Sequence, residues 1–123
     1  MARPAEHFED LEVWQKAHEF VLELYRMTAT FPKAETYGLV AQVRRAAVST
    51  PANIAEGFKK RGRPDKVRFL NIAQGSLEEC RYYLILSRDL GYADPTNAFG
   101  LLNSTALLLQ GYVNAIVRSI NKP

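Results

Sequence analysis

The stretch YGLVAQVRRAAVSTPANIAEGFKKR, residues 37–61, carries the clearest indication of the fold of this chain. At about 100° per residue, its apolar and small side chains recur on one side, as on the buried face of a packed helix. That face consists of Leu39, Val43, Ala46, Ala47, Thr50 and Ile54. The pattern predicts a long amphipathic helix at the centre of a helical protein.

A second line of side chains, which we name the polar seam, runs beside the apolar face. Its members recur every three or four residues and are Gln42, Arg45, Ser49, Asn53 and Glu56. Half-buried amides, hydroxyls and charges are costly unless each finds a partner. We therefore expect the polar seam to contact another helix or another subunit.

Pro51 lies inside this predicted helix. It lacks the N–H that would bond the carbonyl of Ala47, and its ring disfavours helical geometry at Thr50. We expect a kink of the helix between Ser49 and Pro51. Gly57 is predicted to close the helix just before the basic residues.

Three further helices are predicted around this one. They run from Glu9 or Asp10 to Thr28, from Pro64 to Gly91 and from Pro95 to about Ile120. The inward side chains of the first are predicted to be Leu11, Trp14, Ala17, His18, Val21, Leu24, Tyr25 and Thr28. Short loops make an all-α, up-down-up-down antiparallel four-helix bundle the expected fold, in one domain over residues 1–123 with residues 1–7 as a loose arm.

Composition places the chain among ordinary globular proteins, with 47% hydrophobic and 24% charged residues. A single cysteine, Cys80, excludes an internal disulfide and suits a reducing compartment. The N-terminus has no apolar stretch typical of a signal peptide, and no apolar run approaches the roughly 20 residues of a membrane span. We expect a cytoplasmic protein without a membrane partner.

A family resemblance rests on QVRRAAVSTPANIAEG, residues 42–57. This block resembles the signature of four-helix-bundle proteins first noticed as products of intervening sequences within bacterial large-subunit ribosomal RNA genes. Three other blocks agree with it in order: FEDLEVWQKA (8–17), FPKAETYGL (31–39) and RFLNIAQGSLEEC (68–80). A related protein, the accessory protein of diversity-generating retroelements, is a pentameric ring that binds nucleic acid and reverse transcriptase. The resemblance thus implies a homopentamer.

Self-association is also indicated by apolar residues that lie off the predicted core faces. These are Val67, Tyr82 and Ile85 on the third helix, and Leu107 and Val117 on the fourth. Single exposed apolar residues are normal, but several on adjoining helices favour a subunit interface.

The basic residues are concentrated between positions 59 and 68, where Asp65 is the one acid. They are Lys59, Lys60, Arg61, Arg63, Lys66 and Arg68, and Arg44 is a further candidate because it projects away from the apolar face. Clustered cations bind phosphate backbones without reading sequence. We expect a nucleic-acid site, chiefly for structured RNA. The alternative is a scaffold that docks a partner enzyme such as a reverse transcriptase without touching nucleic acid.

No motif indicates an enzyme. His7 and His18 are the only histidines and neither follows a glutamate by three residues, as di-metal bundles require. Ser49 with His18 could form a nucleophile and base, but we interpret both as structural, and Glu56 as an ion-pair partner of Arg45 or a loop cation. We therefore expect no catalysis, metal or cofactor.

Overall fold

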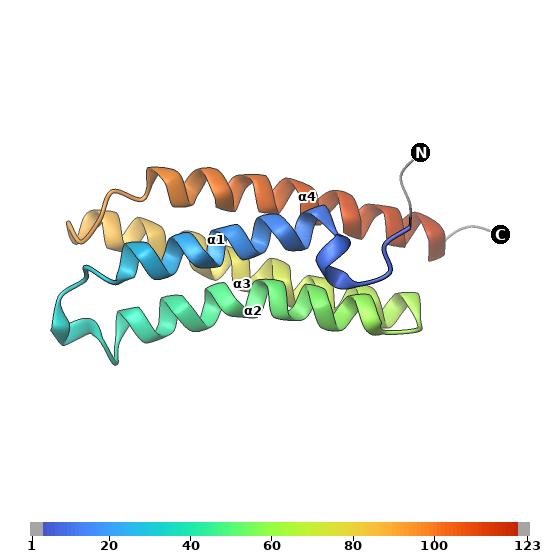
Figure 1. Cartoon of the computed structure of the whole chain (residues 1–123), viewed down its shortest axis with the longest axis horizontal. Coiled ribbons are helices and arrows are strands. Elements are labelled where there is room, and N and C mark those ends of the chain that lie inside the picture. Colours follow the sequence, from blue (N-terminus) through green and yellow to red (C-terminus); the bar gives the residue numbers. More distant parts are fainter. Residues whose placement is uncertain (1–3, 121–123) are drawn as a thin grey trace.

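Four long helices and two short 3-10 turns make up the computed structural model, which describes residues 4–120 (Figure 1). They are η1 (Phe8–Asp10), α1 (Glu12–Thr28), η2 (Lys33–Glu35), α2 (Leu39–Lys59), α3 (Arg63–Asp89) and α4 (Thr96–Ile120). Each helix packs against the next along the chain, and α4 returns to α1. This arrangement confirms the predicted all-α four-helix bundle.

The core forms where the predicted apolar face of α2 meets its neighbours. All six predicted residues of that face are buried. One buried cluster joins Val43 to Phe20, Leu84 and Leu102, and a second joins Ile54 to apolar residues of α1, α3 and α4. The apolar periodicity of α2 therefore positions the other three helices.

The buried face of α1 differs from the prediction. His18 is exposed and Tyr25 is 42% exposed, whereas Val13 and Phe20 are in the core. The face is turned toward α4, because α1 must bury side chains against α2 and α4 together. His18 instead stacks on the half-buried ring of Trp14, with 5.1 Å between the ring centroids.

Helix α2 continues through Pro51, whose ring is buried, and the kink at that position stays a prediction. The prediction that Gly57 closes the helix is wrong, because α2 runs on to Lys59. A Cβ at Gly57 would lie 3.2 Å from the Cβ of Phe69 and 3.3 Å from the carbonyl oxygen of Lys66. Gly57 therefore allows α2 and α3 to approach closely.

The predicted start and stop signals hold for α3 and α4, whereas α1 begins at Glu12 and not at Glu9 or Asp10, which belong to the separate turn η1. Pro64 lies in the first turn of α3, and Gly91 has a φ of +73° just beyond its end. The carboxylate of Asp94 accepts hydrogen bonds from the backbone N–H and the hydroxyl of Thr96, which caps α4. None of the helices within residues 4–120 combines the length and apolarity of a bilayer span.

The predicted arm falls partly outside the described residues, which begin at residue 4. Within residues 4–7, the backbone N–H groups of His7 and Glu6 donate to the carboxylate of Asp10, and these bonds lower the pKa of that carboxyl. The segment next to η1 is therefore tied to the turn rather than loose.

Candidate nucleic-acid interface

Residues 60–62 form the turn that joins α2 to α3. The turn is short because α2 continues to Lys59 and α3 already starts at Arg63. It lies at the same end of the bundle as the N-terminal segment (Figure 1). The predicted basic residues between positions 59 and 68 are thus gathered at one end, but they have different surroundings.

Lys66 is used by the fold. Its ammonium donates to the carbonyl oxygens of Phe58 at 2.6 Å and Gly57 at 3.3 Å. These carbonyls belong to the last turn of α2, where the helix dipole favours a cation. Burial, and next the charge of Arg63, lower the pKa of Lys66. Lys66 therefore closes α2 and is less available to a ligand.

Two further cations lie on the ring of Phe69. The guanidinium of Arg68 is 4.7 Å from the ring centroid and also forms an ion pair of 3.0 Å with Asp65. The ammonium of Lys60 is 4.8 Å from the same centroid. Both keep their charge near the surface, but Asp65 neutralises Arg68.

Three cations remain exposed: Lys59, Arg61 and Arg63. Among the described residues, no hydrogen bond or ion pair involves their side chains. Arg63 lies in the first turn of α3, where the helix dipole disfavours a positive charge and no side chain caps the helix. An anion bound there would relieve that repulsion.

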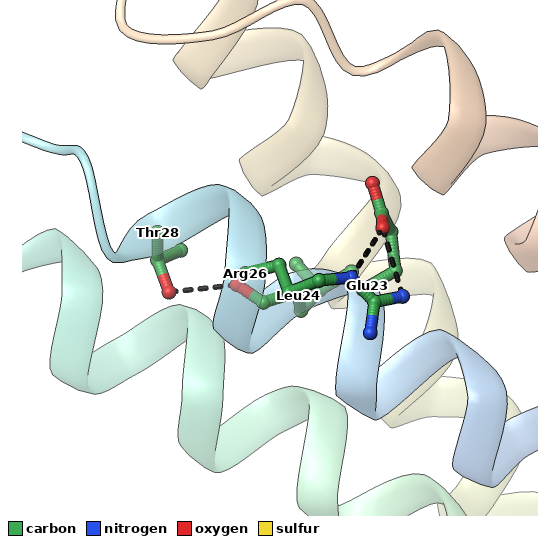
Figure 2. A network of polar contacts seen from close by, with 4 residues as sticks. All are labelled: Glu23, Leu24, Arg26 and Thr28. Atoms are coloured by element: carbon green, nitrogen blue, oxygen red, sulfur yellow. Dashed lines mark hydrogen bonds and ion pairs between the residues drawn. The ribbon is translucent and has the colours of Figure 1, made fainter.

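Arg44 was predicted to project away from the apolar face of α2, where it could reach a ligand, but its guanidinium is bonded to α1. Its Nε donates to the hydroxyl of Thr28 at 2.9 Å, and its Nη2 donates to the carbonyl of Tyr25 at 3.3 Å. The guanidinium also lies 4.4 Å from the centre of the Tyr25 ring. Figure 2 shows how Thr28 in turn donates to the carbonyl of Leu24. Arg44 therefore caps the C-terminus of α1.

The polar seam contacts another helix, as expected, and that helix is α3 of the same chain. The hydroxyls of Ser49 and Ser76 are 2.8 Å apart, and the amide of Asn53 donates to the carbonyl and hydroxyl oxygens of Ser49. The phenol of Tyr83 donates to Gln42 at 3.2 Å. Three of the five seam residues, Gln42, Ser49 and Asn53, are thus satisfied within the bundle.

The charged members of the seam, Arg45 and Glu56, are exposed. No ion pair within residues 4–120 includes either one, so the predicted pairing of Glu56 is not formed. Arg45 borders a cleft of about 300 Å³ between α2 and α3. At its rim a hydrogen bond to Glu79, together with burial, raises the pKa of Tyr83 to about 12.

A second hollow, of about 430 Å³, lies beside the basic turn and was not predicted from the sequence. Phe8, Ala55 and Phe58 give it an apolar lining, and Glu6, Glu9, Glu56 and Lys59 are among its other lining residues. The Phe8 block was noticed for its family resemblance, but only the packing of η1 on α2 creates the hollow.

The groups considered for catalysis are not brought together. Ser49 bonds Ser76 and Asn53, whereas His18 stacks on Trp14. Burial, and next Glu79, raise the pKa of the Cys80 thiol to about 12, so that the reactive thiolate is disfavoured. Within the described part of the chain, no cluster of histidine, cysteine and carboxylate side chains could hold a metal ion.

Comparisons with known proteins agree on the fold. A family described as 23S rRNA-intervening sequence protein matches residues 9–110. A crystal structure of a protein of unknown function from the S23 ribosomal protein family of Bacteroides thetaiotaomicron is 22% identical and has a TM-score of 0.62, over 89% of this chain and 99% of that chain. At this identity the likeness shows the fold alone. A comparison with curated proteins gave no match.

Proposed function

Since this chain belongs to the family of 23S rRNA-intervening sequence proteins, we propose that it is a non-enzymatic, cytoplasmic protein that binds structured RNA through the turn between α2 and α3. The observation that carries the proposal is the group of exposed cations Lys59, Arg61 and Arg63, which lack partners among the described residues. Such a group attracts phosphates and releases their counterions.

The contact set is smaller than the sequence indicated. Lys66 is bonded to backbone carbonyls and Arg68 is paired with Asp65. We therefore assign both residues a structural role in the turn and not a contact with RNA. Arg44 caps α1 and is left out of the contact. We assign Lys60 a minor part in the RNA contact, because its ammonium lies over the ring of Phe69.

The turn offers cations but no free stacking surface. Phe58 is half-buried, and Phe69 is covered by Lys60 and Arg68. Proteins that read single strands stack bases on open aromatic rings. We therefore propose that the turn contacts the phosphates of folded RNA rather than unpaired bases.

A single turn with three cations binds weakly, so we further propose that the chain acts as a homo-oligomer, a pentamer as the family resemblance implies. Repeated turns on one assembly bind the same RNA with a high effective concentration. The exposed Tyr82, Leu107 and Val117 support the existence of a contact between copies.

The test compares two double variants that both change the net charge from +3 to −1. One carries Arg61→Glu and Arg63→Glu at the turn, and the control carries Lys33→Glu and Arg88→Glu at the other end of the bundle. Binding of a folded RNA is measured at several salt concentrations. The turn variant should reduce the slope of log affinity against log salt by ~1.4–1.8 for each bound turn, at ~0.7–0.9 per phosphate, while the control keeps the wild-type slope. Equal slopes in the two variants would exclude the turn as the contact.

The alternative function, docking of a partner protein such as a reverse transcriptase, is favoured by the apolar hollow beside the turn. Ala55→Arg would fill this hollow with a charge. If the chain acts as a scaffold, the Ala55→Arg variant should no longer bind the partner protein. The double variant Arg61→Glu, Arg63→Glu should still bind it.

A further inference from the structure

The cleft of about 300 Å³ between α2 and α3 is separate from the basic turn. Two hydrogen bonds between the helices frame it, one from Tyr83 to Gln42 and the other between Ser49 and Ser76. These bonds are two helical turns apart on each helix, which is about 10 Å. Between them the cleft is lined by Ala46, whose side chain is a single methyl group. The space is that of the smaller ligand pockets, which begin at about 300 Å³.

Arg45 and Glu79 place opposite charges on the opposite walls of this cleft. Arg45 lies three residues after Gln42 in α2, and Glu79 lies four residues before Tyr83 in α3, which runs antiparallel to α2 (Figure 1). Both side chains are therefore at the level between the two framing bonds. Within residues 4–120, no ion pair joins them. Opposite charges across an open cleft suit a molecule that carries one group for each of them.

The two serines of the cleft leave one hydroxyl hydrogen without an acceptor. Asn53 donates to the hydroxyl oxygen of Ser49, and one of the two serines donates to the other. Each hydroxyl has a single hydrogen, so the second serine keeps one that no hydrogen bond among the described residues uses. In other helices, Thr28 and Thr105 instead donate to the carbonyl four residues before them. The remaining serine hydrogen is available to a ligand in the cleft.

The charged and amide groups of the cleft complete this set. The side-chain oxygen of Gln42 faces Tyr83, whereas its amide nitrogen makes no hydrogen bond among the described residues. The carboxylate of Glu79 accepts from the phenol of Tyr83 at 2.5 Å and keeps further lone pairs. This bond is the main reason that the pKa of Tyr83 is raised to about 12, and the charge of Arg45 opposes the rise. A guanidinium, an amide and a hydroxyl thus offer hydrogens to a carboxylate, while Glu79 offers oxygens to an ammonium.

We propose that the cleft between α2 and α3 binds a small zwitterion with one carboxylate and one ammonium group, the chemistry of a free α-amino acid. The carboxylate accepts hydrogen bonds from Arg45, from the amide of Gln42 and from the available serine hydroxyl. The ammonium donates to Glu79. An anion alone would bring a like charge to Glu79, and an amine alone would bring one to Arg45. The site goes beyond the proposed RNA contact, because none of its residues belongs to the basic turn.

The test is a titration of the isotope-labelled full chain with L-alanine, followed by the chemical shifts of its backbone amides. Propionate lacks the ammonium group of L-alanine, and ethylamine lacks its carboxylate, so these two molecules are matched probes. L-Alanine should shift the amides near Ser49 and Ser76 and saturate in the millimolar range. Each partial probe should bind about 10–100-fold more weakly, because it loses the hydrogen bonds to one charged group.

Charge-neutralising variants then assign each half of the ligand to its wall. Arg45→Gln and Glu79→Gln should each weaken binding of L-alanine by about 10–100-fold. Arg45→Gln should weaken propionate but not ethylamine, and Glu79→Gln should do the reverse. A merely structural role would not produce this crossed pattern. The controls Arg88→Gln and Glu78→Gln make the same charge changes outside the cleft and should keep the wild-type affinity.

Three outcomes would overturn the inference. Absence of saturable shifts with L-alanine would exclude the site, and propionate that binds as tightly as L-alanine would show an anion site instead. Equal losses in the variants and their controls would place the binding outside the cleft. Each of these results leaves RNA binding by the turn in place, because the turn residues are unchanged. Far-UV circular dichroism checks that the variants fold, and Arg45→Met is the second variant if Arg45→Gln does not.

Discussion

The two ends of the bundle treat their polar residues in opposite ways. At the end that joins α1 to α2, Arg44 caps α1, Glu35 accepts a hydrogen bond from Tyr92, and Asp94 caps α4. At the end that joins α2 to α3, Lys59, Arg61 and Arg63 are exposed and, among the described residues, have no ion-pair partner. Polar side chains complete the fold at the first end, whereas at the second end only Lys66 and the pair of Arg68 with Asp65 do so and three cations remain exposed.

The difference follows from the backbone groups that each helix end exposes to nearby side chains. Arg44 lies beside the C-terminus of α1, whose carbonyl groups need donors. Arg63 starts α3, where the backbone groups nearby are N–H donors and the dipole is positive. The same side chain is therefore stabilising at one helix end and uncompensated at the other.

The largest effect on stability is expected for Arg44→Ala. The variant loses two hydrogen bonds from a charged group and the contact with Tyr25. We expect a loss of about 2 kcal/mol in the free energy of unfolding, measured by urea denaturation at one fixed protein concentration. Arg63→Ala should change that free energy by less than about 0.5 kcal/mol. Similar losses in the two variants would break the contrast between the ends.

Lys66→Met separates the supporting cation from its exposed neighbours. Methionine keeps most of the apolar stem but cannot donate to the carbonyls of Gly57 and Phe58. The free energy of unfolding should fall by about 1.5 kcal/mol. Lys59→Met, at an exposed site, should be neutral within about 0.5 kcal/mol. If Lys59→Met lowers the free energy of unfolding more than Lys66→Met does, Lys59 also stabilises the fold.

Gly57→Ala tests whether the turn is held by close packing. The new methyl group would press on the Cβ of Phe69 and the carbonyl of Lys66, neither of which can yield without moving α3. Overpacking should lower the free energy of unfolding by about 1–3 kcal/mol, and the better helix propensity of alanine should restore up to about 1 kcal/mol. We expect a net loss of about 1 kcal/mol in the free energy of unfolding. The control Gly75→Ala has open space around its Cβ and should stabilise the protein by about 0.5–1 kcal/mol. A stabilised Gly57→Ala variant would show that α3 can shift.

The smallest effect concerns the polar seam between the ends. The hydrogen bond to Glu79 raises the pKa of Tyr83 to about 12, above the ordinary 10.0. Because the folded pKa is raised, its contribution to stability is complete below about pH 10 and is lost as the pH rises through 12. Glu79→Gln should shift this ionisation to lower pH in a tyrosinate absorbance titration, whereas Tyr82→Phe should leave it in place. An unchanged titration in Glu79→Gln would exclude the hydrogen bond as its cause.

Local patterns predicted the helices well and their contacts less well. The apolar period of α2 identified six of its nine buried residues, and it missed Val40, Pro51 and Gly57. The same reasoning placed His18 and Tyr25 of α1 in the core and missed Phe20. The apolar period of a helix gives the direction of its buried face, whereas the width of that face depends on how many helices pack against it. The glycine signal at Gly57 was ambiguous for a similar reason, since glycine suits both a helix end and a close helix contact.

In the candidate site, too, local sequence patterns predicted some features, whereas others depend on contacts between distant segments. The concentration of cations between positions 59 and 68 is visible in the sequence, and the spacing of Asp65 and Arg68 is that of an ion pair on one helix. The bond from Arg44 to Thr28 joins residues sixteen positions apart, and no local pattern indicates it. The hollow at Phe8 and Phe58 likewise depends on two distant segments.

Periodicity and composition act along the chain, so they were sufficient to predict four amphipathic helices, most of the buried face of α2 and a basic turn. Which cations are bonded at helix ends and which stay exposed depends on distances between elements, so this distinction required the folded structure. The folded structure also showed that Gln42 and Ser49 of the polar seam bond α3 within the same chain. The set of available cations is therefore a property of the packed bundle.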